Sequence, residues 1–265
     1  MPLKITLDPG HGRNDNRSPN YPTYVEGTQM WHLAVYLEKA LERYGFDVVT
    51  TRPNIDENPT LEERGQIAGE NTSCLMLSLH SNSPAKREDG TYDPKVTGTV
   101  AFYPLSTPEI KKLADALGER VSAMMDHYFR GSQTKSYPNS PKLDYYGVIR
   151  NALAYGCRNA IILEHGFHTN PSDAQYLLDD VKLKALAEAE AEIIAEYFGL
   201  KKQSTVVSDV VKLDNEPQGW SKEAVDWAVK NKILNGDENG NLKLREPCTR
   251  EELITILYRA LGKEN

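Results

Sequence analysis

The chain has 265 residues, a formal net charge of −7 and 39% hydrophobic residues. This length allows one full domain core and a small second unit, and the acidic balance gives no sign of nucleic-acid binding. No apolar run approaches the ~20 residues that a membrane span needs. The cysteines Cys74, Cys157 and Cys248 lack metal-type spacing, and we expect Cys74 and Cys157 to be small core residues.

Two histidines follow predicted buried strands. The strand over Leu3 to Leu7 runs into Asp8-Pro9-Gly10-His11-Gly12, where proline and glycine end the strand and let a ligand approach the backbone. The strand over Cys74 to Leu79 ends at His80-Ser81-Asn82. Because parallel strands present their carboxyl ends at one edge of a sheet, we expect His11 and His80 at the same edge.

Helices and strands alternate along the first 200 residues, which indicates an α/β fold. The apolar spacing predicts helices over 30–44, from the capping box at Thr60-Leu61-Glu62-Glu63, from a Thr107 cap to about 129, from Pro171, and over 182–198. Further strands are predicted over 46–51, 98–103 and 160–163, with a surface loop over 131–144 and a short extended piece over 146–150.

Several ionisable or aromatic side chains have two interpretations. Glu26, near the start of a helix, is either favoured by the helix dipole or a metal ligand. Glu164 ends a strongly apolar strand and needs a partner. We expect His32 and His127 at the surface. Three tyrosines either line a sugar-binding groove or pack locally: Tyr137, Tyr145 and Tyr146.

Two imidazoles and one carboxylate are the ligands of a catalytic zinc site with an open fourth position. A further carboxylate outside the metal's ligand set can move a proton, which suits amide hydrolysis without a covalent intermediate. Spacing alone does not choose between His80 and the His165/His168 pair as ligands. The chain has no Gly-x-Ser-x-Gly elbow, phosphate-binding loop or His-Glu-x-x-His motif.

The order of the motifs resembles the zinc-dependent N-acetylmuramoyl-L-alanine amidases of the type-3 family, from residue 1 to about 198. The resemblance is carried by residues 8–12, Glu26, Thr51-Arg52, Arg64, residues 78–82 and residues 163–170. It implies a twisted, mainly parallel sheet flanked by helices. It also implies Zn²⁺ at His11, Glu26 and His80, with Glu164 as the catalytic glutamate.

The implied substrate is peptidoglycan, cut between the lactyl group of N-acetylmuramic acid and L-alanine. Two features depart from the family: Arg13 replaces a frequent second glycine, and histidines occupy positions 165 and 168. We expect Asn82, His165 and His168 to support the metal site or to contact substrate, and we expect His165 either to hold a metal ligand in place or to serve only the fold.

The remaining chain predicts a polar linker over 201–209 between a catalytic domain (1–200) and a small helical module (210–265). The module has a predicted helix over 220–232, a turn over 235–241 and a last helix after Thr249. It resembles one surface-layer homology repeat. Because a single repeat buries little core, it is either a reduced module that binds cell-wall polymer or a dimerisation unit.

The N-terminus lacks the apolar region of a signal peptide. With the two-part layout, this suggests a phage or prophage endolysin, made in the host cytoplasm and acting on the cell wall after release. A bacterial autolysin or sporulation amidase is the alternative. A non-catalytic wall-binding protein is a third interpretation, and a zinc deacetylase a fourth. We expect neither nucleic-acid binding nor membrane insertion.

Overall fold

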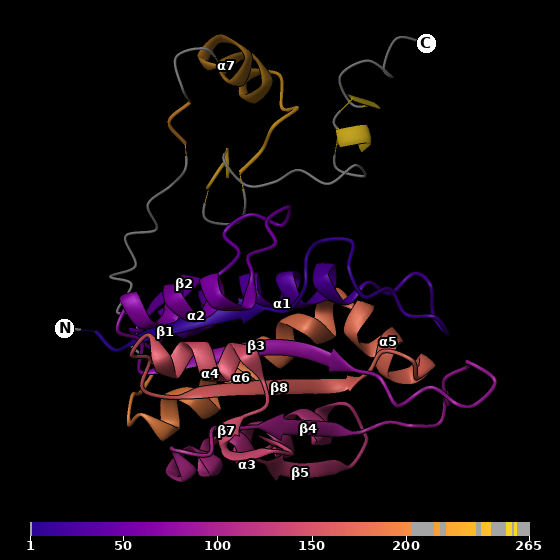
Figure 1. Cartoon of the computed structure of the whole chain (residues 1–265). Helices are drawn as coiled ribbons and strands as arrows, with labels where there is room; N and C mark the ends of the chain where they lie inside the picture. The colour runs from indigo at the N-terminus through magenta and orange to yellow at the C-terminus, as the bar shows by residue number, and fades with distance from the viewer. Residues whose placement is uncertain are drawn as a thin grey trace. The chain divides into compact units, whose positions relative to one another are not determined.

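The computed structural model describes residues 2–202, 215–217, 221–236, 240–244, 253–255 and 257–258. Its contacts divide the chain into two units, residues 1–203 and 204–265. The first unit alternates strands and helices (Figure 1), and the second contains helix α7 (Lys222–Lys230). Residues 203–209 of the predicted linker lie outside the described part, as do Cys248 and residues 249–252 before the predicted last helix. Among the described helices, none is both long and apolar enough to cross a membrane.

Six strands form one sheet in the order β2-β1-β3-β8-β4-β5. The strands are β1 (Lys4–Pro9), β2 (Asp47–Thr50), β3 (Leu75–Asn82), β4 (Thr99–Phe102), β5 (Phe129–Gln133) and β8 (Ala160–Phe167). β2, β1, β3 and β8 are parallel, whereas β4 pairs antiparallel with β8 and parallel with β5. The predicted mainly parallel sheet is confirmed.

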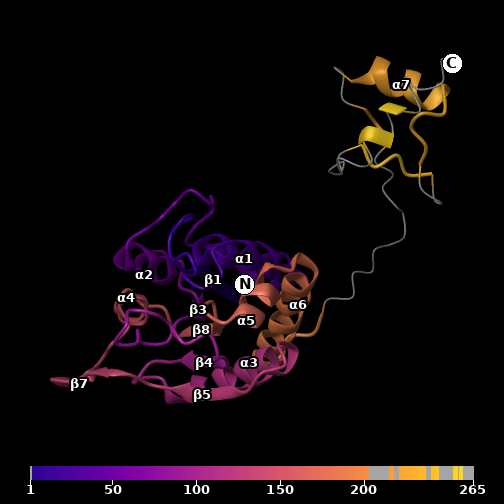
Figure 2. The same ribbon diagram turned by 90° about the vertical axis from the view of Figure 1, so that its right-hand side faces the viewer.

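Helices cover both faces of the sheet (Figure 2). One face carries α1 (Glu26–Glu42), α3 (Lys111–Met124), α5 (Pro171–Leu178) and α6 (Asp180–Tyr197); the other carries α2 (Leu61–Glu70) and α4 (Gly147–Ala154). The larger core lies under the first set and the smaller core under α2 and α4. Cys74 lies in the larger core and Cys157 in the smaller, both as buried free thiols, which confirms the prediction for them.

Local sequence signals hold at some helix ends and fail at others. Thr60 and Glu63 form the predicted capping box, in which Glu63 N donates to Thr60 Oγ1 at 3.2 Å. Thr107 precedes the short 3-10 helix Pro108–Ile110 without capping it, and its hydroxyl has no hydrogen-bond partner among the described residues. The helix predicted to reach about residue 129 ends at Met124, because Asp126 adopts a left-handed backbone with φ of 55°.

The segment after α3 differs most from prediction. The predicted loop over 131–144 holds the end of β5 and a hairpin of β6 (Ser136–Tyr137) and β7 (Ser140–Asp144). The predicted extended piece over 146–150 was wrong, since these residues start helix α4. Its apolar side chains Val148 and Ile149 pack into the smaller core, so tertiary packing decides the conformation.

The prediction of a surface His127 was also wrong. Its side chain is 3% exposed, with Nδ1 3.1 Å from Asp173 Oδ1 and Nε2 2.8 Å from Thr99 Oγ1. Asp173 also accepts a hydrogen bond from Phe167 N at 2.8 Å, so this cluster ties β8 to α5. His32 is half-buried beside Trp31.

Candidate metal centre and active site

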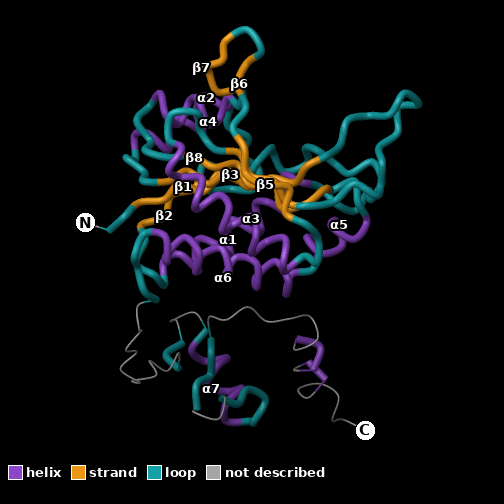
Figure 3. The backbone as a smooth tube through the Cα atoms, turned by 90° about the horizontal axis from the view of Figure 1, so that it is seen from below, coloured by secondary structure: helices purple, strands orange, loops and turns teal. Residues whose placement is uncertain are grey.

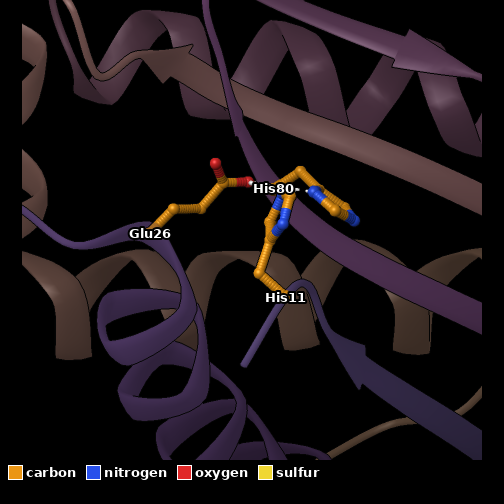
Figure 4. A group of neighbouring side chains, drawn as sticks. All are labelled: His11, Glu26 and His80. Atoms are coloured by element: carbon orange, nitrogen blue, oxygen red, sulfur yellow. Dashed lines mark hydrogen bonds and ion pairs between the residues drawn. The ribbon is translucent and has the colours of Figure 1, made fainter. Parts of the chain in front are cut away.

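Three ligand-type side chains meet at the carboxyl edge of the sheet, as Figure 4 shows. His11 follows β1, Glu26 is the first residue of α1, and His80 lies near the end of β3. Their potential ligand atoms all lie within 4.8 Å of one another. Glu26 Oε1 is 2.9 Å from His80 Nδ1 and 3.4 Å from His11 Nε2. Two imidazole nitrogens and a carboxylate oxygen therefore converge on one point.

Glu26 is fully buried and held from several sides. Ser81 N donates to its Oε1 at 2.9 Å, and the Asn16 amide donates to its Oε2. Burial raises the pKa of Glu26, but hydrogen bonds with His11 and His80 outweigh burial and lower it overall. Burial lowers the pKa of His80, and the Glu26 carboxylate overrides this effect and raises the pKa to about 9. The carboxylate is therefore ionised at neutral pH and stabilises a positive charge beside it.

Glu164 lies on β8 directly opposite His80 in the β3–β8 register. Burial raises the pKa of Glu164 to about 7, and the negative charge of Glu26 adds to this effect. Its Oε2 is buried and has no hydrogen-bond partner among the described residues. A carboxyl group of this kind can both accept and release a proton near neutral pH.

A cleft of about 410 Å³ opens beside the histidines. Its lining includes Gly10, His11, Asn58, Leu61, His80 and Val148. The cleft thus lies between the sheet edge and helices α2 and α4, and a substrate in it reaches both histidines.

A family model for N-acetylmuramoyl-L-alanine amidases (Amidase_3) matches residues 5–196. The chain belongs to this family. A second model, for the S-layer homology domain, matches residues 213–254. The first unit is therefore a peptidoglycan amidase of this family, and the second carries an S-layer homology sequence.

Individual relatives agree with this assignment. N-acetylmuramoyl-L-alanine amidase CwlM of Bacillus licheniformis is 24% identical over 216 residues, which span 78% of this chain and 74% of CwlM. The probable cell wall amidase LytH of Staphylococcus aureus is 26% identical over 197 residues, which span 73% of this chain and 58% of LytH.

Solved structures share the fold. The amidase AmiC2 of Nostoc punctiforme superposes with a TM-score of 0.60 at 25% identity, covering 74% of this chain and 97% of AmiC2. The catalytic domain of CwlV from Bacillus (Paenibacillus) polymyxa gives 0.61 at 22% identity, covering 75% of this chain and 99% of that domain.

In this amidase a buried charge network fixes the turn that carries His11. Arg64 Nη1 donates to Asp8 Oδ1 at 2.7 Å, and its Nη2 donates to His11 O at 3.0 Å. Thr51 and Ser78 hydroxyls each donate to Asp8 at 2.6 Å. Burial raises the pKa of Asp8, but Arg64 and these hydrogen bonds outweigh it and lower the pKa. No role is predicted for Asp8 from the sequence, although a carboxylate next to an apolar strand needs a partner.

A second arginine and two glycines complete the turn. The fully buried Arg52 donates to Gly27 O at 2.9 Å and to Gly10 O at 3.3 Å. A Cβ at Gly10 would lie 2.3 Å from His80 Cε1, and a Cβ at Gly27 would lie 1.7 Å from Gly12 O. The His80 ring and the first turn of α1 can therefore approach the turn only because these positions are glycine.

The three predicted supporting residues have different surroundings. His168 Nδ1 is 3.5 Å from Glu26 Oε2 and 3.1 Å from Ser81 Oγ, so this residue contacts the Glu26 carboxylate from the side of Ser81. His165 is fully buried; its Nδ1 lies 3.0 Å from His80 O and its Nε2 2.9 Å from Glu190 Oε1 on α6. Asn82 accepts a hydrogen bond from Ser83 N with its side chain and from His168 N with its backbone oxygen.

Proposed function

We propose that this chain is a zinc-dependent hydrolase that cleaves the amide between the lactyl group of N-acetylmuramic acid and L-alanine in peptidoglycan. The observation that carries the proposal is the placement of Glu164 across from His80 in a site where His11, Glu26 and His80 converge. Two imidazoles and one carboxylate fit a catalytic zinc with one open position. Bound Zn²⁺ supplies a Lewis acid that lowers the pKa of water from ~15.7 towards ~7.

The chain's own groups supply the proton transfers. Glu164 accepts a proton from the attacking water and later delivers it to the nitrogen of the leaving L-alanine. Its pKa of about 7 suits both steps at neutral pH. The Asp8–Arg64 pair and Arg52 hold the His11 turn, so ligand positions are set before substrate enters.

The test is hydrolysis of purified peptidoglycan by the full chain, before and after chelation. We expect new N-terminal alanine without new reducing sugars, loss of activity with chelator, and recovery with Zn²⁺. Glu164→Gln should bind zinc but expose no new N-terminal alanine. The control Glu192→Gln, on the exposed face of α6, should keep full activity. Release of acetate in place of alanine would identify a deacetylase and contradict the proposal.

The biological setting is a separate proposal. The S-layer homology match over residues 213–254 supports an autolysin that is held at the wall through cell-wall polymer. The endolysin role, with synthesis in a host cytoplasm and release on lysis, stays a prediction from the sequence. Fractionation of growing producer cells separates the two, because an autolysin sediments with the wall during growth and an endolysin does so only after membrane breach.

The second unit has two proposed partners, wall polymer and a second copy of the chain. Its described part exposes large apolar side chains: Trp227, Val229, Leu253, Ile254, Leu257 and Tyr258. Cosedimentation with walls before and after extraction of non-peptidoglycan polymers tests the first partner. Analytical ultracentrifugation of the full chain tests the second, since only self-association makes the sedimentation coefficient rise with concentration.

A further inference from the structure

A row of aromatic rings leads from the smaller core to an exposed hairpin. The rings of Phe102 and Tyr146 are 4.6 Å apart, those of Tyr146 and Tyr145 5.3 Å, and those of Tyr145 and Tyr137 5.3 Å. Exposure grows along the row: Phe102 is buried and Tyr146 half-buried, whereas Tyr145 and Tyr137 are 40% and 38% exposed. The row thus has a fixed end inside the protein and an open end on the β6–β7 hairpin.

The base of this hairpin is tied to the domain. Asp144 accepts a hydrogen bond from Leu105 N at 3.0 Å, and Arg150 donates to Asp144 O at 2.7 Å. Tyr145 N donates to Lys135 O at 2.8 Å, and the Lys135 ammonium lies 4.0 Å from the centre of the Tyr145 ring. Rings held in this way lose little conformational entropy when a ligand binds.

The row adjoins the active-site cleft. Tyr146 immediately precedes α4, and Val148, two residues later, lines the cleft with His11 and His80. Burial raises the pKa of Tyr146, and the negative charge of Glu164 adds to this rise. Figure 3 shows the β6–β7 hairpin projecting beyond α2 and α4, on the same side of the sheet as these two helices.

We propose that Tyr137 and Tyr145 form a subsite for sugar rings of the peptidoglycan glycan strand. The proposal rests on the proposed function and names the part of the substrate that lies outside the cleft. The scissile amide is linked through a lactyl group to a sugar, so a substrate bound at Glu164 carries its glycan strand out past the cleft. Pyranose rings present flat C–H faces that pack on the exposed parts of aromatic rings such as Tyr137 and Tyr145.

The contacts of the two cations beside these rings favour the glycan over the stem peptide as the ligand. A site for peptide carboxylates needs cations without other contacts. Lys135 lies over the Tyr145 ring, and Arg150 lies 5.5 Å from the Tyr137 ring and donates to Asp144 O. A protein partner is disfavoured because stable protein interfaces need about 800 Å² on each side, far more than two half-exposed tyrosines offer.

The first test compares two substrates with Tyr137→Ala and Tyr145→Ala. On polymeric peptidoglycan we expect KM to rise about tenfold for each variant, equal to ~1.4 kcal/mol. On N-acetylmuramoyl-L-alanyl-D-isoglutamine, which has one sugar, kcat/KM should stay within about twofold. Phenylalanine at either position should retain most of the affinity because the ring provides the contact. The control is Lys142→Ala on the same hairpin, which should behave like the unaltered protein.

The second test measures binding without catalysis. In a Glu164→Gln background, peptide-free glycan strands should bind, and Tyr145→Ala should weaken this binding about tenfold. Absence of binding to peptide-free strands would overturn the proposed subsite. Two other results would also overturn it: tyrosine variants that lose the same share of kcat/KM on both substrates, or a Lys142→Ala variant that loses as much affinity as Tyr145→Ala. If the unaltered protein cleaves neither substrate with zinc bound, the proposed function fails, and the binding arm still decides on the glycan subsite.

Discussion

Asp8→Asn tests whether the buried ion pair with Arg64 stabilises the site. Both side chains are almost fully buried, at 1% and 4% exposure. The asparagine keeps the size of Asp8 but leaves the guanidinium without a counter-charge. Removing one partner of a buried pair costs about 3–5 kcal/mol, which lowers the midpoint of thermal unfolding by roughly 6–20 °C for a unit of this size. Circular dichroism during heating and urea titration measures both quantities.

Two comparisons separate charge from simple hydrogen bonding. Ser78→Ala removes one hydrogen bond to the ionised Asp8 carboxylate and should cost about 1.5–3 kcal/mol. The loss of stability in the double variant D8N/R64M should be smaller than the sum of the losses in D8N and R64M, because each single change breaks the same ion pair. If D8N is no less stable than S78A, or if the losses of the two single variants add up in the double variant, the reasoning is refuted.

The pH dependence of the same pair has a definite sign. The pKa of Asp8 in the folded protein lies below its ordinary value of 3.8, so the carboxylate stabilises the fold above about pH 4. This contribution is lost as pH falls through the lowered pKa. The difference in stability between the unaltered protein and D8N should therefore be constant near neutral pH and shrink below about pH 4; a difference that grows in acid would contradict this assignment.

Three further outcomes are expected. Activity should rise with pH as Glu164 ionises, with a midpoint at or below about 7 because a bound cation lowers the pKa; a pH–rate profile without this limb contradicts its role as proton acceptor. His165→Ala should lower the free energy of unfolding by about 1–3 kcal/mol, since it leaves Glu190 unpaired. Metal analysis should show that this variant keeps its zinc, and a variant that is inactive but stable argues against a structural role. Gly10→Ala should weaken zinc binding in calorimetric titration with the fold retained, because the new Cβ displaces the His80 ring.

The sheet edge was predictable because the sequence signals it locally. Apolar strands that run into His11 and His80 predict two imidazoles at one edge, and β1 and β3 do lie side by side in parallel. The choice of Glu26 came from the resemblance, since a helix-start glutamate is usually only a favourable charge for the dipole. Its burial and its hydrogen bond from Ser81 N are contacts across 55 residues that no local pattern contains.

The surroundings of His127 and Asp8 could not be predicted for the same reason, since they also depend on residues that are distant in the sequence. His127 follows a helix and looks solvated, yet a left-handed Asp126 turns the chain so that the ring meets Asp173 on a distant helix. Asp8 begins the motif Asp8-Pro9-Gly10-His11-Gly12, but its partner Arg64 lies 56 residues away. Residue type shows that a buried charge needs a partner, and only the tertiary fold shows which one it finds.

The roles of Glu164 and His165 could have been separated from the sequence by strand geometry alone. Successive side chains of a strand point to opposite faces, so two neighbours on β8 cannot both face the cleft. Glu164 points to the same face of the sheet as Ile162, which packs in the smaller core under α2 and α4. His165 points to the same face as Leu163, which packs in the larger core, and there it contacts Glu190 of α6. His165 therefore lies behind the sheet, where its Nδ1 is 3.0 Å from the backbone oxygen of His80, and the proposed proton acceptor Glu164 lies on the cleft side.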